Sequence, residues 1–261
     1  MAEGAARPIR KIEGQRTKLG RTMHGISYDP VHDEFFVTQP FAQAILAFRG
    51  AASGEEPPIR TIQGPLTELR DPDRLEIDPV HNEIFVPEDD KVLVFRRDAS
   101  GNVAPIRTLN ALDGTAGPDA VAVDPVHNLI AVASWVGKRQ EEKPMLLIYN
   151  RTDQGDAKPL RTIRGPRTGI TGTFGLRIYP PRGWLFVAMS GPDYSGPYDK
   201  AFVGVWSVED NGDVPPRWRI GGPDGILKQP RGMDFDPKNK TLIISDKVLN
   251  AILTYQFPEM Y

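Results

Sequence analysis

One stretch, Ile77-Asp78-Pro79-Val80-His81-Asn82-Glu83-Ile84-Phe85-Val86, decides the fold of this chain. It places short apolar runs on both sides of an Asp-Pro turn, a pattern that predicts a β-hairpin. Related turns recur at residues 28–33, 123–128, 179–183 and 235–239, which makes five copies with the first stretch. Five hairpins of one kind indicate a repeat protein.

A second segment, which begins with proline, recurs in step with the turn. It occupies residues 8–12, 58–62, 105–109, 159–163 and 216–220, with Pro-Ile-Arg or a close variant at its start. Short runs rich in β-branched and aromatic residues lie between the two markers and are bounded by Gly, Pro, Asn or Asp. Each repeat therefore contains four strands, and proline at the start of the fourth fits a sheet edge.

A single four-stranded sheet of this size cannot bury both of its faces, so such sheets stack around an axis. The sequence predicts an all-β protein, a five-bladed β-propeller of four-stranded antiparallel blades. We expect one domain over residues 1–261, with blades near 21–62, 72–109, 118–163, 173–220 and 230–257. Residues 8–12 lack three preceding strands, and the last three strands lack a fourth. We therefore expect residues 8–12 to pair with the strand around residues 251–255 and close the ring.

The repeats resemble NHL-type propeller repeats, which carry a similar apolar strand, an Asp-Pro-x-x-Asn-like turn and an Ile/Val-Phe-Val strand. The resemblance covers nearly the whole chain and implies the propeller fold. It leaves the function open, because NHL-like propellers include scaffolds, ligand binders and enzymes. Many of them have six blades, whereas no stretch of this chain is long enough to add a sixth.

Composition narrows the classes of function. The 261 residues are 39% hydrophobic and 25% charged, and the net charge is -2, so neither a nucleic-acid partner nor an anionic-membrane anchor is expected. The absence of cysteine excludes disulfides, thiolate metal sites and cysteine nucleophiles. No apolar run approaches the roughly 18 residues of a transmembrane helix. As written, the sequence indicates a cytoplasmic protein, or a periplasmic or extracellular one if Met1 replaces a removed signal.

Histidines occur in two settings. His32, His81 and His127 occupy one position of the repeated turn, where we expect them to brace the hairpin. The fourth, His24, precedes the innermost strand of the first blade. The equivalent positions in the other blades carry Asp73, Asp119, Phe174 and Arg231. Such a ring could line the mouth of a central channel and bind a small polar ligand or a cation. The alternative is a salt-bridge cluster that fills the channel.

A metal-dependent enzyme is a second possibility. Gluconolactonase-like propeller enzymes hold a divalent cation with Glu, Asn and Asp at the channel mouth, and this chain offers Glu88 and Asp246 just past the second strand. The other blades carry Gln39, Ser134 and Met189 there, and no asparagine. We expect no cofactor, with calcium or another divalent cation as the alternative.

The strongest departures from the repeat are two long connections between the second and third strands, at residues 134–144 and 190–200. Loops elaborated on one face of a repeat protein often bind a partner. They supply the candidate binding residues Trp135, Lys138, Arg139, Asp193, Tyr194 and Tyr198, of types enriched at interfaces. The alternative is that these loops cap the channel, or that Trp135 packs into the core.

These patterns favour a non-enzymatic scaffold that docks a protein partner, as an accessory or assembly subunit, through the face that carries these loops. The alternative is a metal-dependent hydrolase or lactonase, or a small-ligand binder, acting at the channel mouth. An enzyme needs acid, base and ligand groups that converge, whereas the carboxylates here alternate with aliphatic and basic residues.

Overall fold

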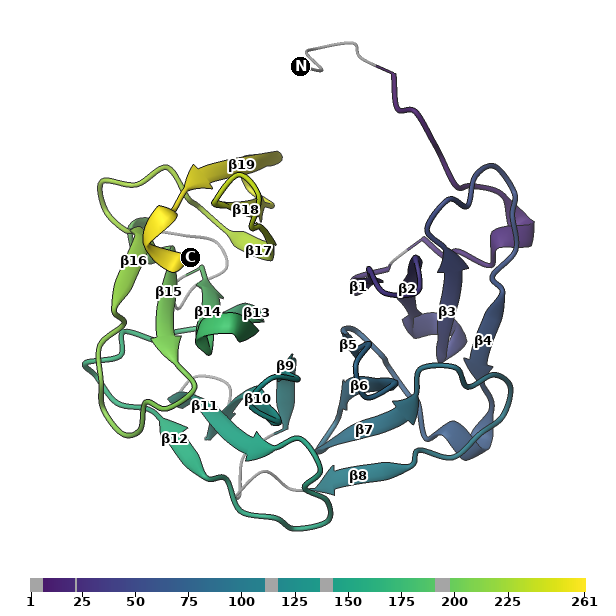
Figure 1. Ribbon diagram of the computed structural model, residues 1–261, viewed down its shortest axis with the longest axis horizontal. Coiled ribbons are helices and arrows are strands. Elements are labelled where there is room, and N and C mark those ends of the chain that lie inside the picture. Colours follow the sequence, from purple (N-terminus) through teal and green to yellow (C-terminus); the bar gives the residue numbers. More distant parts are fainter. Residues whose placement is uncertain (1–6, 22, 111–116, 137–142, 191–197) are drawn as a thin grey trace. The chain divides into compact units, whose positions relative to one another are not determined.

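In the described part of the chain, nineteen β-strands and short 3-10 turns build the protein, and no α-helix occurs (Figure 1). The computed structural model describes residues 7–21, 23–110, 117–136, 143–190 and 198–261. The 3-10 turns are η1 (Gln15–Thr17), η2 (Pro40–Ala42), η3 (Pro65–Thr67), η5 (Pro180–Arg182), η6 (Tyr198–Lys200) and η7 (Pro258–Met260). Residues 111–116, 137–142 and 191–197 lie outside the described chain.

The strands form five antiparallel sheets, each built from strands that are consecutive in the sequence. Blade 1 contains β1 (Ile26–Asp29), β2 (Glu34–Gln39), β3 (Ala44–Arg49) and β4 (Arg60–Gln63). Blade 2 contains β5 (Glu76–Asp78), β6 (Glu83–Glu88), β7 (Lys91–Arg96) and β8 (Arg107–Asn110). Blade 3 contains β9 (Pro118–Asp124), β10 (Leu129–Val136), β11 (Lys143–Asn150) and β12 (Arg161–Ile163).

Blade 4 contains β13 (Thr173–Tyr179), β14 (Trp184–Met189), β15 (Phe202–Ser207) and β16 (Trp218–Gly221). Blade 5 contains β17 (Pro230–Asp236), β18 (Thr241–Asp246) and β19 (Ala251–Gln256). The predicted fold, an all-β five-bladed propeller, is confirmed. That residues 1–261 form one domain stays a prediction.

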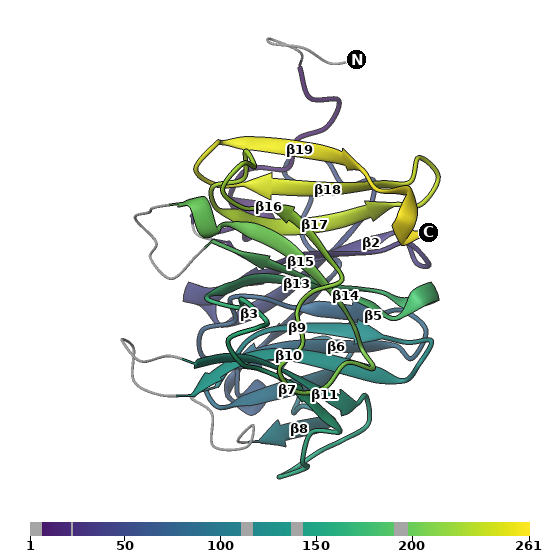
Figure 2. The same cartoon turned by 90° about the vertical axis from the view of Figure 1, so that its left-hand side faces the viewer.

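The chain packs as two compact units. The first contains Met1–Ile84 and Val94–Ile106, and the second contains Phe85–Leu93 and Arg107–Tyr261. Blade 1 belongs to the first unit, where β1 lies beside β5. Blades 3 to 5 belong to the second, where the inner strands β9, β13 and β17 follow one another (Figures 1 and 2).

The repeated turn explains why each hairpin forms. Its last residue adopts a left-handed conformation, with φ of 52° at Asp33, 61° at Asn82, 58° at Asn128 and 61° at Gly183. Asp, Asn and Gly tolerate positive φ better than other residues, which is why they recur at this position. The turn thereby fixes the register of the strands on either side.

Stacked blades bury apolar side chains between their faces. In the second unit, one core cluster includes Leu146 and Ile148 of β11 and Trp206 of β15, all with 0% exposure. A second joins Phe186 of β14 to Leu242 of β18. Each fully buried large side chain stabilises the fold by about 1.5 to 3 kcal/mol. The core therefore lies between sheets, as the repeat requires.

Fourth strands contact the next blade through a glycine. Isolated parallel bridges pair Ile62 with Gly101, Leu109 with Gly155 and Ile163 with Gly212. These glycines have φ of 86°, 60° and 81°, a region that favours glycine. The same bridge therefore recurs from blade to blade, and its glycine lies in the loop between the third and fourth strands.

The N-terminal segment contacts blade 1. Residues 8–12 form no strand, and the fifth sheet contains the three strands β17 to β19. Residues 8–12 belong to the first unit and residues 251–255 to the second, so their pairing stays a prediction. Ile12 forms a parallel bridge with Gly54 of blade 1. Gly54 N donates to Lys11 O at 2.7 Å and Glu13 N donates to Gly54 O at 3.0 Å. These contacts match those by which each fourth strand contacts the glycine of the next blade.

Candidate functional site

The two long connections each join the second strand of a blade to the third, in the neighbouring blades 3 and 4. Trp135 lies near the end of β10, opposite Pro144 of β11, and is half-buried. Tyr198 begins η6 and is half-buried, and its carbonyl accepts a hydrogen bond from Ala201 N at 3.0 Å. Lys138, Arg139, Asp193 and Tyr194 lie outside the described residues. The structure therefore places the bases of both connections, and the binding role of these six residues stays a prediction.

Arg219 adds a cation next to the blade 4 connection. Its guanidinium lies over the Phe202 ring, 4.0 Å from the centroid, and Phe202 pairs with Met189 at the base of the connection. The arginine is exposed, whereas Phe202 is only 3% exposed. A cation held over an aromatic face is fixed in place more firmly than a free surface arginine. Our sequence interpretation missed Arg219. The other four proline segments carry Thr or Lys at the equivalent position, and that difference was the available signal.

Two of the channel-mouth candidates meet in the first unit. His24 Nδ1 contacts Asp73 Oδ1, with 54% and 44% of these side chains exposed. Thr38 holds the backbone beside them, because its hydroxyl donates to Asp73 O at 3.0 Å and accepts from Gly25 N at 3.0 Å. The pair is open to water and is anchored by blade 1.

The other channel-mouth candidates lie in the second unit. Arg231 lies over the Phe174 ring, 3.9 Å from the centroid, and Phe174 is 7% exposed. Asp119 is half-buried on β9. Nearby, Arg177 Nε donates to Met233 O at 3.2 Å and so joins blade 4 to blade 5. The predicted set is thus found as a His-Asp pair in one unit and an Arg-Phe pair in the other.

One of the two metal candidates, Asp246, is engaged in hydrogen bonds to the backbone. Asp246 Oδ2 accepts hydrogen bonds from Lys228 N and Gln229 N at 2.7 and 2.9 Å. Its Oδ1 accepts from Val248 N and Leu249 N, both at 3.0 Å. This carboxylate, 2% exposed, organises two backbone turns. Glu88, at the end of β6, is 4% exposed. Within the described ranges, no three His, Cys, Asp or Glu side chains are grouped as metal ligands.

The turn histidines brace their hairpins, as predicted. In each of blades 1 to 3, the histidine Nδ1 lies 2.7 Å from the aspartate Oδ2; the pairs are His32 with Asp29, His81 with Asp78, and His127 with Asp124. The other carboxylate oxygen accepts two backbone N–H groups, for example from Val126 and His127 in blade 3. These histidines therefore have local structural partners.

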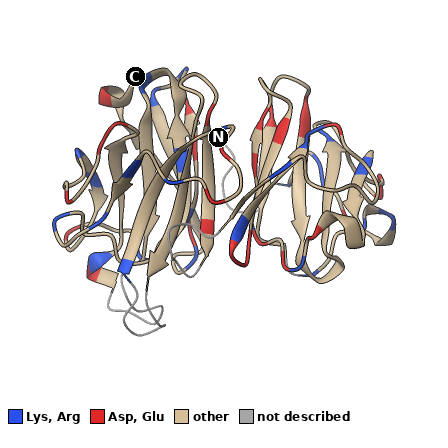
Figure 3. Ribbon diagram, turned by 90° about the horizontal axis from the view of Figure 1, so that it is seen from below, with Lys and Arg blue, Asp and Glu red and all other residues tan. Residues whose placement is uncertain are grey.

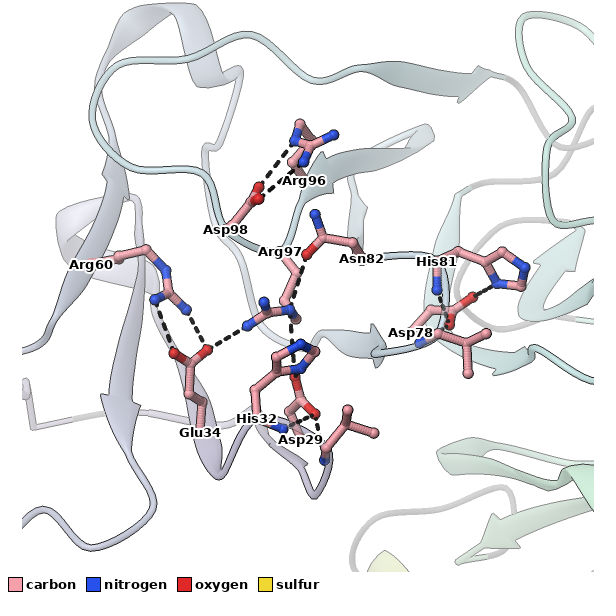
Figure 4. Close-up of polar contacts among 12 residues, drawn as sticks. Asp29, His32, Glu34, Arg60, Asp78, His81, Asn82, Arg96, Arg97 and Asp98 are labelled. Atoms are coloured by element: carbon pink, nitrogen blue, oxygen red, sulfur yellow. Dashed lines mark hydrogen bonds and ion pairs between the residues drawn. The ribbon is translucent and has the colours of Figure 1, made fainter.

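A buried cluster of charges joins blade 1 to the segment after β7 (Figure 4). Glu34 Oε1 accepts from Arg60 Nη1 at 3.0 Å, and Glu34 Oε2 lies 2.5 Å from Arg97 Nη1. Arg97 Nε donates to Asn82 Oδ1 at 3.0 Å and lies 3.5 Å from Asp29 Oδ2. Buried charges are costly unless paired, and each charge here has a partner.

Blade 4 fills the same positions with aromatic rings. Trp184 and Trp218 take the places of Glu34 and Arg60, and their ring centroids lie 5.2 Å apart in an edge-to-face arrangement. Phe257 takes the place of Arg97 and lies 5.5 Å from Trp218. Because rings and ion pairs occupy one repeat position, we infer that the cluster of Glu34, Arg60 and Arg97 contributes to packing between neighbouring strands and turns.

An open groove in blade 1 was not foreseen. It has a volume of about 520 Å³ and is lined by Ala42, Gln43, Gln63, Gly64, Pro65 and Leu69. Phe41 and Leu66 lie within the two turns that line it, with 80% and 58% exposure. Gln63 Nε2 donates to Ala42 O at 2.8 Å and so connects the two turns. The available signal was an aromatic residue inside the turn Pro40-Phe41-Ala42.

Charged residues are interspersed over the connections, with Lys and Arg next to Asp and Glu in both units (Figure 3). This agrees with the small net charge of -2. None of the described helical segments is long and apolar enough to span a bilayer.

The fold defines the class of this protein, a β-propeller. A chain from the Nidogen/Laminin complex superimposes with a TM-score of 0.65 and 15% identity, over 92% of this chain and 77% of that one. Hydrazine synthase from Kuenenia stuttgartiensis gives a TM-score of 0.63 and 13% identity, over 89% and 70%. A functionally unknown protein from Desulfotomaculum acetoxidans DSM 771 gives 0.58 and 12%, over 93% and 68%.

Sequence comparison adds no family. No family model matches the chain, and no curated protein matches it. Structural likeness at this level of identity establishes the fold alone. Membership of the NHL repeat family therefore stays a prediction.

Proposed function

We propose that this protein is a non-enzymatic interaction propeller, an accessory or assembly subunit that docks a protein partner. The docking face is the one that carries the long connections of blades 3 and 4. The observation that carries the proposal is the pair of elaborated connections on neighbouring blades of one unit. Trp135, Lys138, Arg139, Asp193, Tyr194 and Tyr198 are the proposed contacts, and we add Arg219.

Topology supports a shared face for these connections. β10 and β14 are the second strands of adjacent blades in the second unit, whose inner strands β9 and β13 lie side by side. Connections that follow equivalent strands leave from the same side of a stack of blades. β10 and β11 have 8 residues each, against 6 in β2 and β3, so the blade 3 hairpin reaches further out.

The chemistry of the face favours recognition. Trp, Tyr and Arg are the residue types that contribute most to protein interfaces. Arg219 over Phe202 is held in place, which lowers the entropy lost on binding. A chain from the Nidogen/Laminin complex is among the similar propellers, which supports a propeller as a protein-binding module.

The enzymatic alternative has less support. A hydrolase of the metal-dependent kind needs several oxygen ligands around one point. Asp246 already accepts four backbone hydrogen bonds, and the described ranges contain no group of three ligand side chains. We therefore propose the scaffold and no second function.

The test replaces both long connections with the short connection of blade 5, residues 245–250. The wild-type and replaced proteins are used as baits in parallel pull-downs, and retained proteins are identified by mass spectrometry. We expect the replacement to abolish retention of the specific partner, with an unchanged far-UV CD spectrum and thermal unfolding.

A matched control changes the same connection in another blade. Residues 40–43 of blade 1 are replaced by residues 247–250, which have equal length. This control should keep the partner. Retention of the same partner after replacement of both long connections would contradict the proposal.

A further inference from the structure

Arg219 of β16 is positioned by residues from two other segments of the second unit. Its guanidinium lies 4.0 Å from the centroid of the Phe202 ring in β15. In the loop before β13, a β-carbon at Gly169 would lie 2.9 Å from Arg219 Nη2 and 3.7 Å from Phe202 Cζ, so the glycine leaves room for both side chains. Blades 3 and 5, which flank blade 4, belong to the same unit. The arrangement is therefore complete within one unit.

Blade 4 departs from the repeat at the strand positions that build this arrangement. The strand registers show that Phe202, Gly204 and Arg219 occupy the positions that in blade 1 carry Ala44, Leu46 and Thr61. A β-carbon at Gly204 would lie 3.0 Å from Phe202 Cε2, so a leucine there would displace the ring. The ring, the glycine and the arginine thus depend on one another.

The loop position of Gly169 changes as well. This loop and two other described copies share a turn in which a threonine hydroxyl donates to the carbonyl of the glycine three residues earlier, at 2.6 to 2.7 Å. The residue after the threonine has a positive φ in each copy and is Lys18, Glu68 or Gly169, with φ of 58°, 60° and 68°. Glycine is thus not required by the backbone of this turn, and its use next to Arg219 coincides with the space that the guanidinium takes.

Stacking leaves the hydrogen-bond donors of Arg219 available. The ring covers a face of the guanidinium, whereas the N–H groups lie in the guanidinium plane. Arg219 is exposed, and within the described ranges no hydrogen bond or ion pair engages it. Two other fourth-strand arginines of this unit have carboxylate partners, namely Arg161 with Glu209 and Arg217 with Asp210. Arg219 is a positioned cation to which the described chain supplies no carboxylate.

From this geometry we infer that Arg219 binds a carboxylate of the protein partner, the side chain of a Glu or Asp in an acidic segment. The inference rests on the proposed docking function and adds the chemistry of the partner. A guanidinium can donate two parallel N–H···O bonds to one carboxylate, and such charge-assisted bonds are stronger than neutral ones. A cation already held over a ring loses less side-chain entropy when the carboxylate binds. One guanidinium matches the single charge of a carboxylate, whereas a phosphate group carries nearly two charges.

A peptide of six glutamates, hexaglutamate, is the probe for the first test. Its binding is followed by fluorescence anisotropy of the labelled peptide, with a peptide of six glutamines as the uncharged control. We expect Arg219→Thr, which introduces the residue that Thr61 supplies in blade 1, to raise the dissociation constant about tenfold. Arg182→Thr changes another exposed arginine of the same blade and should leave the constant unchanged. Equal constants for the two variants would overturn the inference.

A second pair of variants moves the guanidinium without removing its charge. In Gly169→Ala the new methyl group would lie 2.9 Å from Arg219 Nη2 and should displace it. Gly155→Ala is the matched control, because Gly155 has a similar φ of 60° and no atom lies within 4 Å of its β-carbon position. We expect Gly169→Ala alone to raise the dissociation constant of hexaglutamate, by several-fold. Equal effects of the two changes would show that the position of Arg219 does not matter, which contradicts the inference.

Competition distinguishes carboxylates from phosphates. Acetate and inorganic phosphate are compared at equal ionic strength as competitors of labelled hexaglutamate. We expect acetate to displace the peptide at least as well as phosphate does. Stronger displacement by phosphate, lost in Arg219→Thr, would assign the site to a phosphorylated partner and overturn the carboxylate inference.

The pull-down separates this inference from the docking function. Arg219→Thr is used as bait beside the wild-type protein and the protein with both long connections replaced. We expect both changes to lose the specific partner. If only the replacement loses it, docking stands and the inference for Arg219 is overturned. If the replacement keeps the partner, the docking function is contradicted, and the hexaglutamate constants decide separately whether Arg219 binds carboxylates.

Discussion

Arg97 Nη1 lies 2.5 Å from Glu34 Oε2, and this ion pair joins the first residue of β2 to the segment after β7. The two side chains are 9% and 13% exposed, so the pair is largely shielded from water. Arg60 binds the other oxygen of the same carboxylate. Glu34 is therefore the shared anion of two arginines, and its removal leaves Arg97 with only the longer contact to Asp29.

We expect Glu34→Ala to lower the free energy of unfolding by about 3 to 5 kcal/mol, because it removes the carboxylate that two largely shielded arginines share. Glu56, which pairs with Arg49 at 2.7 Å where 62% of the arginine side chain is exposed, provides the control. Its change to alanine should cost about 0 to 1 kcal/mol, as for surface ion pairs. Urea unfolding of both variants measures the difference. Equal losses would show that the cluster adds nothing beyond a surface pair.

The carboxyl of Asp98 gives a pH-dependent prediction. Arg96 binds it through two N–H groups, each at 3.0 Å, and this hydrogen bonding is the main reason that the pKa of Asp98 falls to about 2. The folded pKa is lower than that of the unfolded chain. The pair therefore stabilises the fold above about pH 4, and this stabilisation is lost as the pH falls from there to about 2.

Replacement of the arginine tests this assignment. We expect Arg96→Gln to raise the pKa of Asp98 towards its usual value, as followed by the carboxyl 13C shift in an NMR titration. The stability change itself should be small and reduced by salt, because both side chains are about half exposed. An unchanged pKa in the variant would show that another group holds the carboxylate.

The C-terminal residues contribute to the core of blades 4 and 5. Met260 is 0% exposed and Phe257 is 7% exposed, and both pack in the cluster around Phe186 and Leu242. We expect Met260→Ala to cost about 2 to 5 kcal/mol, as for other buried large-to-small changes. The exposed neighbour Glu259 is the control, and its change to alanine should stay within about 0.5 kcal/mol. Equal urea midpoints for the two variants would contradict this prediction.

Local patterns explain how much of the fold could be predicted. The Asp-Pro turns predicted the hairpins because each turn is built from nearby residues, such as Asp78 with His81. The proline segments predicted fourth strands for the same reason, and four of them pair as expected. The fifth, residues 8–12, contacts Gly54 of blade 1, and its pairing with residues 251–255 stays a prediction.

The candidate site was predicted only in part. Loop length and aromatic composition indicated the long connections of blades 3 and 4. In the structure, Trp135 and Tyr198 lie at the bases of these connections. Neither pattern indicated that Arg219 would lie over Phe202, or that Phe41 and Leu66 would be exposed beside a groove. These features depend on contacts between residues from different strands and turns, which periodicity does not encode.

The sequence by itself determined the repeat, the four-strand unit and the turn chemistry, because backbone preferences and alternating burial act over a few residues. Only the tertiary structure decided how the repeat positions are used. Glu34 and Arg60 form an ion pair where Trp184 and Trp218 stack, and Asp246 holds two backbone turns. The physical reason is that burial and pairing depend on which neighbours the fold supplies to each position.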